Sequence, residues 1–204
     1  MSKKFEKIFI SYCENQNLEV NSNQIKVIKK LEDYHNSNYK SFFSKLFSKQ
    51  KSKKGFYLYG GVGVGKTMIL NFFYERLKEK KLKQHFNEFM LGFHNFVHKR
   101  KEKNEENIIN QFVKNLKSKA SLIYFDEFQV TNIVDAMILG KLFEQIFKED
   151  IKIILTSNTK ISELYKEGLQ REQFIPFIKI MENQTIEYEL KIENDYRKSN
   201  DYQK

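Results

Sequence analysis

The sequence has one cysteine, one proline, no tryptophan and eight glycines among 204 residues. The lone Cys13 cannot form an intrachain disulfide, and four scattered histidines without cysteine partners lack the spacing of a zinc site. No apolar run approaches the roughly 18 residues of a membrane span, and no apolar segment follows the charges of the first seven residues. These absences argue against disulfide-rich, zinc-binding and membrane-spanning proteins, and we expect a cytoplasmic one.

The composition is that of a globular protein, because 40% of the residues are apolar and 30% are charged. A chain of this length suits one domain. The pattern predicts an N-terminal helical extension over residues 1–54, a core over 55–193 and a polar tail over 194–204.

The net charge of +10 is unevenly distributed. Residues 1–54 and 76–119 each hold 12 basic against 5 acidic side chains, whereas residues 120–204 hold 11 against 15. Such asymmetry can attract nucleic acid or anionic lipid. Lysine supplies 32 of the 36 cations, however, alongside abundant Asn, Ile and Phe, so biased codon usage explains the skew equally well. Charge alone therefore does not favour a nucleic-acid partner, and it does not exclude one.

Two helical segments are expected before the core. Asn21, Ser22 and Asn23 can cap a helix that runs towards Tyr34. Residues 40–54 place four apolar side chains at helical spacing among lysines. This stripe favours packing against its own domain, and peripheral contact with an anionic membrane or a partner is the alternative.

From Gly55 onward, strands and helices alternate, which is typical of a parallel α/β sheet. The predicted strands are residues 56–59, 84–89, 122–125, 151–156 and, at an edge, 185–192. The predicted helices are residues 67–80, 90–100, 108–116 and 134–147, with a charged loop at 101–106. The expected fold class is α/β, a parallel sheet sandwiched by helices.

One motif of the form G-x-x-x-x-G-K-[ST] lies between a predicted strand and a predicted helix. Glycines allow successive backbone N–H groups to face phosphate oxygens at a helix N-terminus, where the helix dipole also favours negative charge. Lys66 is expected to reach the β- and γ-phosphates of ATP, and the Thr67 hydroxyl to ligate Mg²⁺. The predicted nucleotide-binding residues are Gly60, Gly61, Val62, Gly63, Val64, Gly65, Lys66 and Thr67. Together with the alternating strands and helices, this motif predicts a P-loop NTPase with a parallel sheet sandwiched by helices.

Two carboxylates, Asp126 and Glu127, end the apolar strand at residues 122–125. That end of a strand is where ligands bind in open α/β folds. Asp126 is expected to hold Mg²⁺, and Glu127 to polarise the attacking water.

Two further polar residues are candidates for catalysis. Asn158, at the tip of the strand at 151–156, can form a hydrogen bond with the γ-phosphate, and so sense whether the triphosphate is intact, or with the attacking water. Arg171 is one of only four arginines, and it can act as an arginine finger that reaches a neighbouring subunit. A solvated surface charge is the alternative for Arg171.

The motifs together resemble the AAA+ ATPases of the ZapE family, which are bacterial cell-division proteins, and their mitochondrial relatives known as lactation elevated protein. The resemblance covers nearly the whole chain, including the helix around Gln24 and the closing Asp195-Tyr196-Arg197. The run at residues 164–171 lies outside the generic nucleotide motifs, which makes the match specific. The segments that carry the resemblance are residues 55–60, 86–90, 124–130, 135–139, 156–158 and 164–178.

The resemblance implies an ATP-dependent machine that forms homo-oligomers and acts on a protein partner, at the division ring in bacteria or in mitochondrial quality control. A nucleotide-gated binding module with little turnover and a DNA-linked ATPase of the helicase-loader type are the alternatives. By analogy with the family, the residues with ATPase roles are Lys66, Thr67, Asp126, Glu127, Asn158 and Arg171.

Three residues differ from the family pattern: Asn87 stands where relatives usually have His, Asn132 where they have Asp, and Thr159 where an Arg is common. We expect Asn87 to contact Glu127 from the second strand, and we expect residues 89–90 to pack in the core. Relatives usually continue past Arg197 into a helical lid, and a chain without one is expected to bind ATP or assemble less well.

Overall fold

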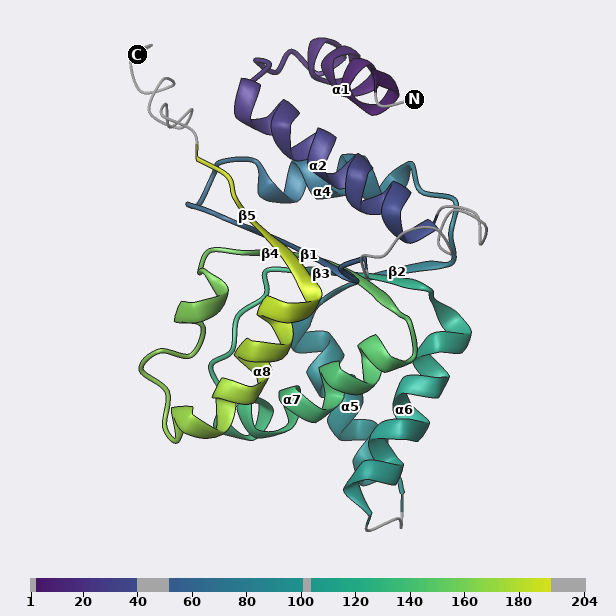
Figure 1. Ribbon diagram of the computed structural model, residues 1–204, viewed down its shortest axis with the longest axis vertical. Helices are drawn as coiled ribbons and strands as arrows, with labels where there is room; N and C mark the ends of the chain where they lie inside the picture. The colour runs from purple at the N-terminus through teal and green to yellow at the C-terminus, as the bar shows by residue number, and fades with distance from the viewer. Residues whose placement is uncertain (1–2, 40–51, 101–103, 192–204) are drawn as a thin grey trace.

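The central element of the fold is a five-stranded parallel sheet with the order β2-β3-β4-β1-β5 (Figure 1). A computed structural model describes residues 3–39, 52–100 and 104–191. The strands are β1 (Gly55–Tyr59), β2 (Lys81–His85), β3 (Leu122–Asp126), β4 (Lys152–Ser157) and β5 (Thr185–Glu189).

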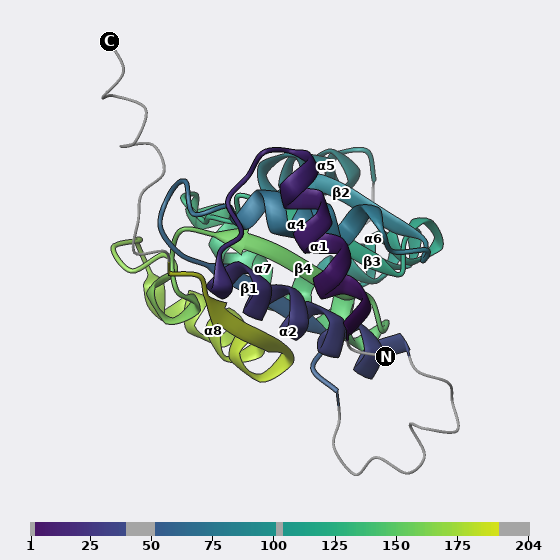
Figure 2. The same ribbon diagram turned by 90° about the horizontal axis from the view of Figure 1, so that it is seen from above.

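Helices cover both faces of the sheet (Figures 1 and 2). One face packs against α2 (Ser22–Tyr39) and α4 (Lys66–Glu75), and α1 (Lys3–Asn15) lies outside these two helices, with Phe9 against Phe72 of α4 (Figure 1). The other face packs against α5 (Phe86–His98), α6 (Glu105–Lys119), α7 (Ile133–Lys148) and α8 (Arg171–Gln184). A short 3₁₀ helix, η1 (Ile161–Glu163), follows β4.

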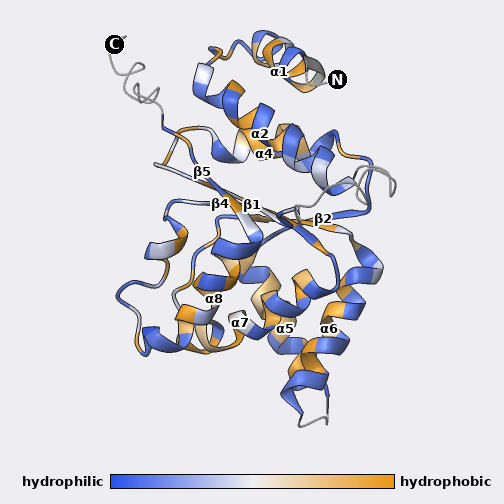
Figure 3. Ribbon diagram, in the orientation of Figure 1, coloured by the Kyte–Doolittle hydropathy of each residue, from blue (hydrophilic) through white to orange (hydrophobic). Residues whose placement is uncertain are grey.

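The alternation of side chains along each strand produces the two separate cores. In β3, Leu122 and Tyr124 join the core under α1, α2 and α4, while Ile123 and Phe125 join the core under α5 to α8. Because the strand is buried on both sides, its sequence is an uninterrupted apolar run. In Figure 3 hydrophobic and hydrophilic residues alternate along the ribbons of α2 and α6, as expected of helices with one side on the sheet.

The predicted fold class, with its short N-terminal helices, is confirmed. The Asn21 side chain accepts a hydrogen bond of 2.9 Å from the Asn23 backbone N–H, so the expected cap of α2 is present. Two helices, α1 and α8, were not predicted, although their buried apolar residues recur at helical spacing, Phe9 and Cys13 in α1 and Phe174, Phe177, Ile178 and Met181 in α8. Within residues 3–39, 52–100 and 104–191, no helix is both long and apolar enough to cross a membrane.

The predicted second strand at residues 84–89 is wrong over most of its length. The strand ends at His85, and Phe86 begins α5. Phe86, Phe89 and Phe93 recur at helical spacing and are all buried under the sheet, so packing of this aromatic side favours the helix. The expectation that residues 89–90 are core residues is confirmed, since Phe89 and Met90 are each 2% exposed.

Several predicted helix boundaries also differ. The helix predicted at residues 67–80 ends at Glu75. The Lys81 ammonium donates to the carbonyl oxygens of Glu75 and Leu77, which gives hydrogen-bond partners to carbonyls at and just after the end of α4. The expected loop at 101–106 overlaps α6, which begins at Glu105 after a cap by Asn104. Residues 40–51, which carry the amphipathic stripe, and the polar tail at 194–204 lie outside the described residues.

Candidate functional site

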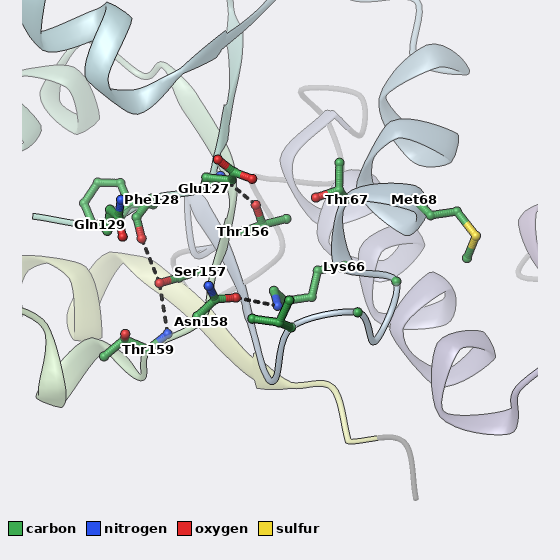
Figure 4. A pocket seen from close by; sticks show the side chains of 13 residues that line it. Lys66, Thr67, Met68, Glu127, Phe128, Gln129, Thr156, Ser157, Asn158 and Thr159 are labelled. Carbon is green, nitrogen blue, oxygen red and sulfur yellow. Dashed lines mark hydrogen bonds between the residues drawn. The ribbon is translucent and has the colours of Figure 1, made fainter. Parts of the chain in front are cut away.

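A cavity of about 510 Å³ lies beyond the carboxyl ends of β1, β3 and β4 (Figure 4). These strands are neighbours in the sheet, and parallel strands end at the same edge, so the three following loops converge there. The residues that line the cavity are Val62, Gly63, Gly65, Lys66, Thr67, Met68, Glu127, Phe128, Gln129, Thr156, Ser157, Asn158 and Thr159.

The loop between β1 and α4 has the backbone that a phosphate cradle requires. Gly60, Gly63 and Gly65 have φ values of 153°, 84° and 91°, which L side chains rarely adopt. A Cβ at Gly60 would lie 2.3 Å from the carbonyl oxygen of Leu190, so this position also excludes any side chain. α4 starts at Lys66, and its first N–H groups have no partner within the helix. This backbone therefore fits a bound phosphate group.

The Lys66 ammonium lies at the centre of the site and is 8% exposed. It donates to the carbonyl oxygens of Gly60 at 2.8 Å and Gly61 at 2.6 Å, and to Oδ1 of Asn158 at 2.9 Å. Burial lowers the pKa of Lys66, and the nearby Asp126 carboxylate partly opposes this effect. Figure 4 shows Lys66 and Asn158 pointing towards each other from the P-loop and the tip of β4.

The Asp126 carboxylate is 5% exposed and accepts two hydroxyl hydrogen bonds on Oδ1. Thr67 donates to it at 3.1 Å and Thr156 at 2.6 Å. In P-loop proteins Mg²⁺ takes one or two protein oxygens, together with phosphate oxygens and water. Among the described residues no group of three or more His, Cys, Asp or Glu side chains could hold a metal alone. The pair of Thr67 and Asp126 fits a Mg²⁺ ion that is shared with a phosphate.

Glu127 has a φ of 54°, an unusual backbone for a residue that is not glycine. Its N–H donates to Oγ1 of Thr156 at 3.0 Å, which holds this turn against β4. Its side chain lines the large cavity and also a smaller one of about 230 Å³, which His85, Asn87 and Asp126 line as well. The strained turn thus presents the Glu127 carboxylate to the space beside Lys66.

The structure shows the surroundings of two residues that differ from the family pattern, Asn87 and Asn132. Asn87 lines the smaller cavity with Glu127, but it lies in the first turn of α5 and not in the second strand. Contact between Asn87 and Glu127 stays a prediction. Oδ1 of Asn132 accepts from the Val134 N–H at 2.8 Å and caps α7, a role that asparagine fills as well as aspartate.

Arg171 is absent from the lining of the cavity. It is the first residue of α8, and its Nη2 donates to the Ser162 carbonyl oxygen at 2.9 Å. Its guanidinium therefore does not complete the site of its own chain, and its action on a neighbouring subunit stays a prediction.

Thr156 and Ser157 are site residues that the sequence motif contains but the sequence analysis did not select. Thr156 binds both Asp126 and Glu127, as described above. Ser157 donates to the carbonyl of Phe128 at 2.8 Å, which ties the loop after β3 to the tip of β4. The available signal was the presence of two hydroxyl residues directly after the buried apolar residues 153–155 of the strand.

Sequence comparison identifies relatives of the chain. A family model described as AFG1-like ATPase matches residues 12–204. Lactation elevated protein 1 homolog B of Danio rerio is 40% identical over 159 residues, which are 73% of this chain and 32% of that protein. Cell division protein ZapE of Escherichia coli K12 is 39% identical over 142 residues, 66% of this chain and 37% of ZapE. The chain thus spans about a third of the length of these curated relatives.

Solved structures share the fold. DnaI is similar with a TM-score of 0.56 and 19% identity, over 88% of both chains. The replication initiator DnaA, bound to AMPPCP and single-stranded DNA, is similar with a TM-score of 0.56 and 19% identity, over 89% of this chain and 50% of DnaA. At such identities the likeness concerns the AAA+ fold alone. The family match, by contrast, covers nearly the whole chain, and the chain therefore belongs to the AFG1-like ATPase family of P-loop ATPases.

Proposed function

We propose that this chain binds ATP with Mg²⁺ and hydrolyses it at the cavity beyond β1, β3 and β4. The observation that carries the proposal is the convergence of Lys66, Glu127 and Asn158 on one cavity, from three separate loops. Asp126 joins them through its hydrogen bond with Thr67, which also lines the cavity. A cation, a metal-binding carboxylate, a second carboxylate and an amide are the groups that phosphoryl transfer to water requires.

Each side chain has a distinct role in this proposal. The Lys66 ammonium would exchange its loop carbonyl partners for phosphate oxygens and neutralise their charge. Thr67 and Asp126 would hold Mg²⁺, which supplies charge neutralisation at the phosphates when bound. Glu127 would orient and polarise the attacking water, and Asn158, already bonded to Lys66, would contact the γ-phosphate.

We further propose that the protein works as a homo-oligomer in the cytoplasm on a protein partner, in cell division or protein quality control. The similarity to cell division protein ZapE supports the division role. Arg171 supports assembly, because it lies outside its own cavity and remains available to a second copy as a finger.

Steady-state ATP hydrolysis over a range of protein concentrations tests both proposals. We expect turnover per chain to rise with concentration, and Glu127→Gln to lower kcat by about 100-fold or more while ATP still binds. Arg171→Ala should lose turnover and keep ATP binding, whereas Arg76→Ala is a matched control because Arg76 stacks on Phe72 away from the cavity. Normal hydrolysis by Arg171→Ala as a pure oligomer would remove the finger assignment.

The same assay separates the alternatives. If the wild type binds ATP but turns over no faster than Glu127→Gln, the chain is a nucleotide-gated binding module. If single-stranded DNA stimulates hydrolysis and high salt abolishes the effect, the partner is a nucleic acid and the proposed protein partner is wrong.

A further inference from the structure

The first turn of α2 lies directly against the P-loop, although 40 residues separate Gln24 from Val64 in the sequence. The Gln24 side chain is buried, with 6% exposed, and its Nε2 donates to the Val64 carbonyl oxygen at 3.2 Å. A Cβ on Gly65 would lie 2.8 Å from the same Nε2. The Gln24 amide therefore packs against the P-loop backbone where the loop enters α4.

The same turn of α2 also contacts the chain after β5. Nδ2 of Asn23 donates to the Lys191 carbonyl oxygen at 2.9 Å. The preceding residue, Leu190, donates its N–H to Tyr59 at 2.7 Å, and its carbonyl fills the space that a side chain on Gly60 would need. The P-loop is thus contacted at both ends, at Val64 by α2 and at Gly60 by the residues after β5, and α2 and these residues also contact each other.

The orientation of one peptide group links these contacts to phosphate binding. In a trans peptide the C=O and the following N–H point in opposite directions, and the described residues contain no cis peptide bond. The Val64 carbonyl points towards α2, where it accepts the hydrogen bond from Gln24, so the Gly65 N–H of the same peptide group points away from α2. Gly65 lines the cavity on that other side.

We propose that Gln24 is a positioning residue for nucleotide binding, because it fixes the Val64–Gly65 peptide with its N–H directed at the phosphate position. The inference rests on the proposed ATP site. It makes α2 a part of that site, and it makes phosphate binding depend on a helix that lies outside the P-loop motif.

The test compares two buried amides on the same helix. Gln24→Met keeps the size of the side chain but removes the donor to the P-loop. Asn38→Leu is the matched control, since Asn38 is 3% exposed and its Nδ2 donates to backbone carbonyls of Tyr34 and Lys53, far from the cavity. The dissociation constant of a non-hydrolysable ATP analogue with Mg²⁺ is measured for both variants and the wild type, well below their melting temperatures.

We expect the dissociation constant of Gln24→Met to be about fivefold to tenfold higher than that of the wild type, because one buried hydrogen bond is lost. KM for ATP should rise in parallel, and kcat should stay within about twofold of the wild type. Asn38→Leu should lower the melting temperature and leave the dissociation constant unchanged. Equal affinity of Gln24→Met and wild type, or an equal loss in both variants, would overturn the inference. An absence of binding by the wild type would instead overturn the nucleotide site itself, and the inference with it.

If Gln24→Met does not fold, hydrogen exchange of the wild type decides. The analogue should slow exchange of the amides at residues 25–28, beside the P-loop, and leave residues 36–39 at the other end of α2 unchanged. The inference is overturned if neither end of the helix responds or both respond equally.

Discussion

Replacement of Thr156 by valine removes one hydroxyl and keeps the shape of the side chain. Thr156 is 1% exposed and lies near the carboxyl end of β4, the central strand of the sheet. Its hydroxyl donates to Asp126 at 2.6 Å and accepts from the Glu127 N–H at 3.0 Å, so one oxygen holds the two carboxylate residues on which the proposed chemistry depends.

The stability loss follows from these two bonds. A hydrogen bond to a carboxylate contributes about 1.5–3 kcal/mol, and the Glu127 N–H left without its partner costs about 1 kcal/mol because water can reach this half-buried turn. The free energy of unfolding should fall by about 3 kcal/mol. For a chain of this size, that corresponds to a melting temperature lower by about 6–12 °C. Because the carboxylates are then less restrained, kcat should also fall by about 10–100-fold. The Mg²⁺ concentration that gives half-maximal activity should rise, since Asp126 would bind the ion less tightly.

The assay is ATP hydrolysis as a function of Mg²⁺ concentration, together with thermal unfolding. Thr156→Ser keeps the oxygen and should retain most of the activity. Thr185→Val is the matched control, because Thr185 is also a buried strand residue but donates only to the Met181 carbonyl, remote from the cavity. If Thr156→Val hydrolyses ATP with the kcat and the Mg²⁺ dependence of the wild type, Thr156 does not position Asp126 and Glu127, and the reasoning fails.

Two further predictions concern stability. A Cβ at Gly168 would lie 2.2 Å from ring atoms of Tyr165, so Gly168→Ala should lower the free energy of unfolding by about 1–3 kcal/mol. A Cβ at Gly140, inside α7, would make only ordinary contacts, so Gly140→Ala should raise it by about 0.5–1 kcal/mol. Denaturant unfolding measures both changes. Burial raises the pKa of Glu32 above its ordinary value of 4.5, and one of its carboxylate oxygens is buried without a partner. The ionised form is therefore penalised in the folded state, so stability is lost as pH rises from 4.5 through the raised pKa. Glu32→Gln should raise the melting temperature at pH 7 and lose this advantage near pH 4, and an advantage independent of pH would contradict the charge argument.

Local sequence predicted the parts of the site that neighbouring residues build by themselves. The phosphate cradle needs closely spaced glycines, a lysine and a helix start, so residues 60–67 identify it without any knowledge of the rest of the chain. The buried strand before Asp126 and Glu127 is similarly visible, because burial on both faces requires an unbroken apolar run.

Secondary structure was less predictable where the pattern was mixed. β2 is an edge strand with a single apolar residue, so its own sequence gives little sign of a strand, and the predicted strand was extended into aromatic residues that have helical spacing. The helix α8 was missed although it carries Arg171 at its first position. For β2 the pairing with β3, and not the local sequence, selects the strand, whereas the helical spacing of Phe174, Phe177 and Ile178 was a local signal for α8.

By itself, then, the sequence determined that this chain carries a P-loop, a pair of strand-end carboxylates and a polar strand tip. The tertiary structure decided which of these meet. β4 lies between β1 and β3, which brings Asn158 to Lys66 and Thr156 to Asp126, and α2 packs where Gln24 reaches Val64. These contacts join residues 30 to 92 positions apart, and their geometry depends on strand order and helix packing, which no short segment encodes.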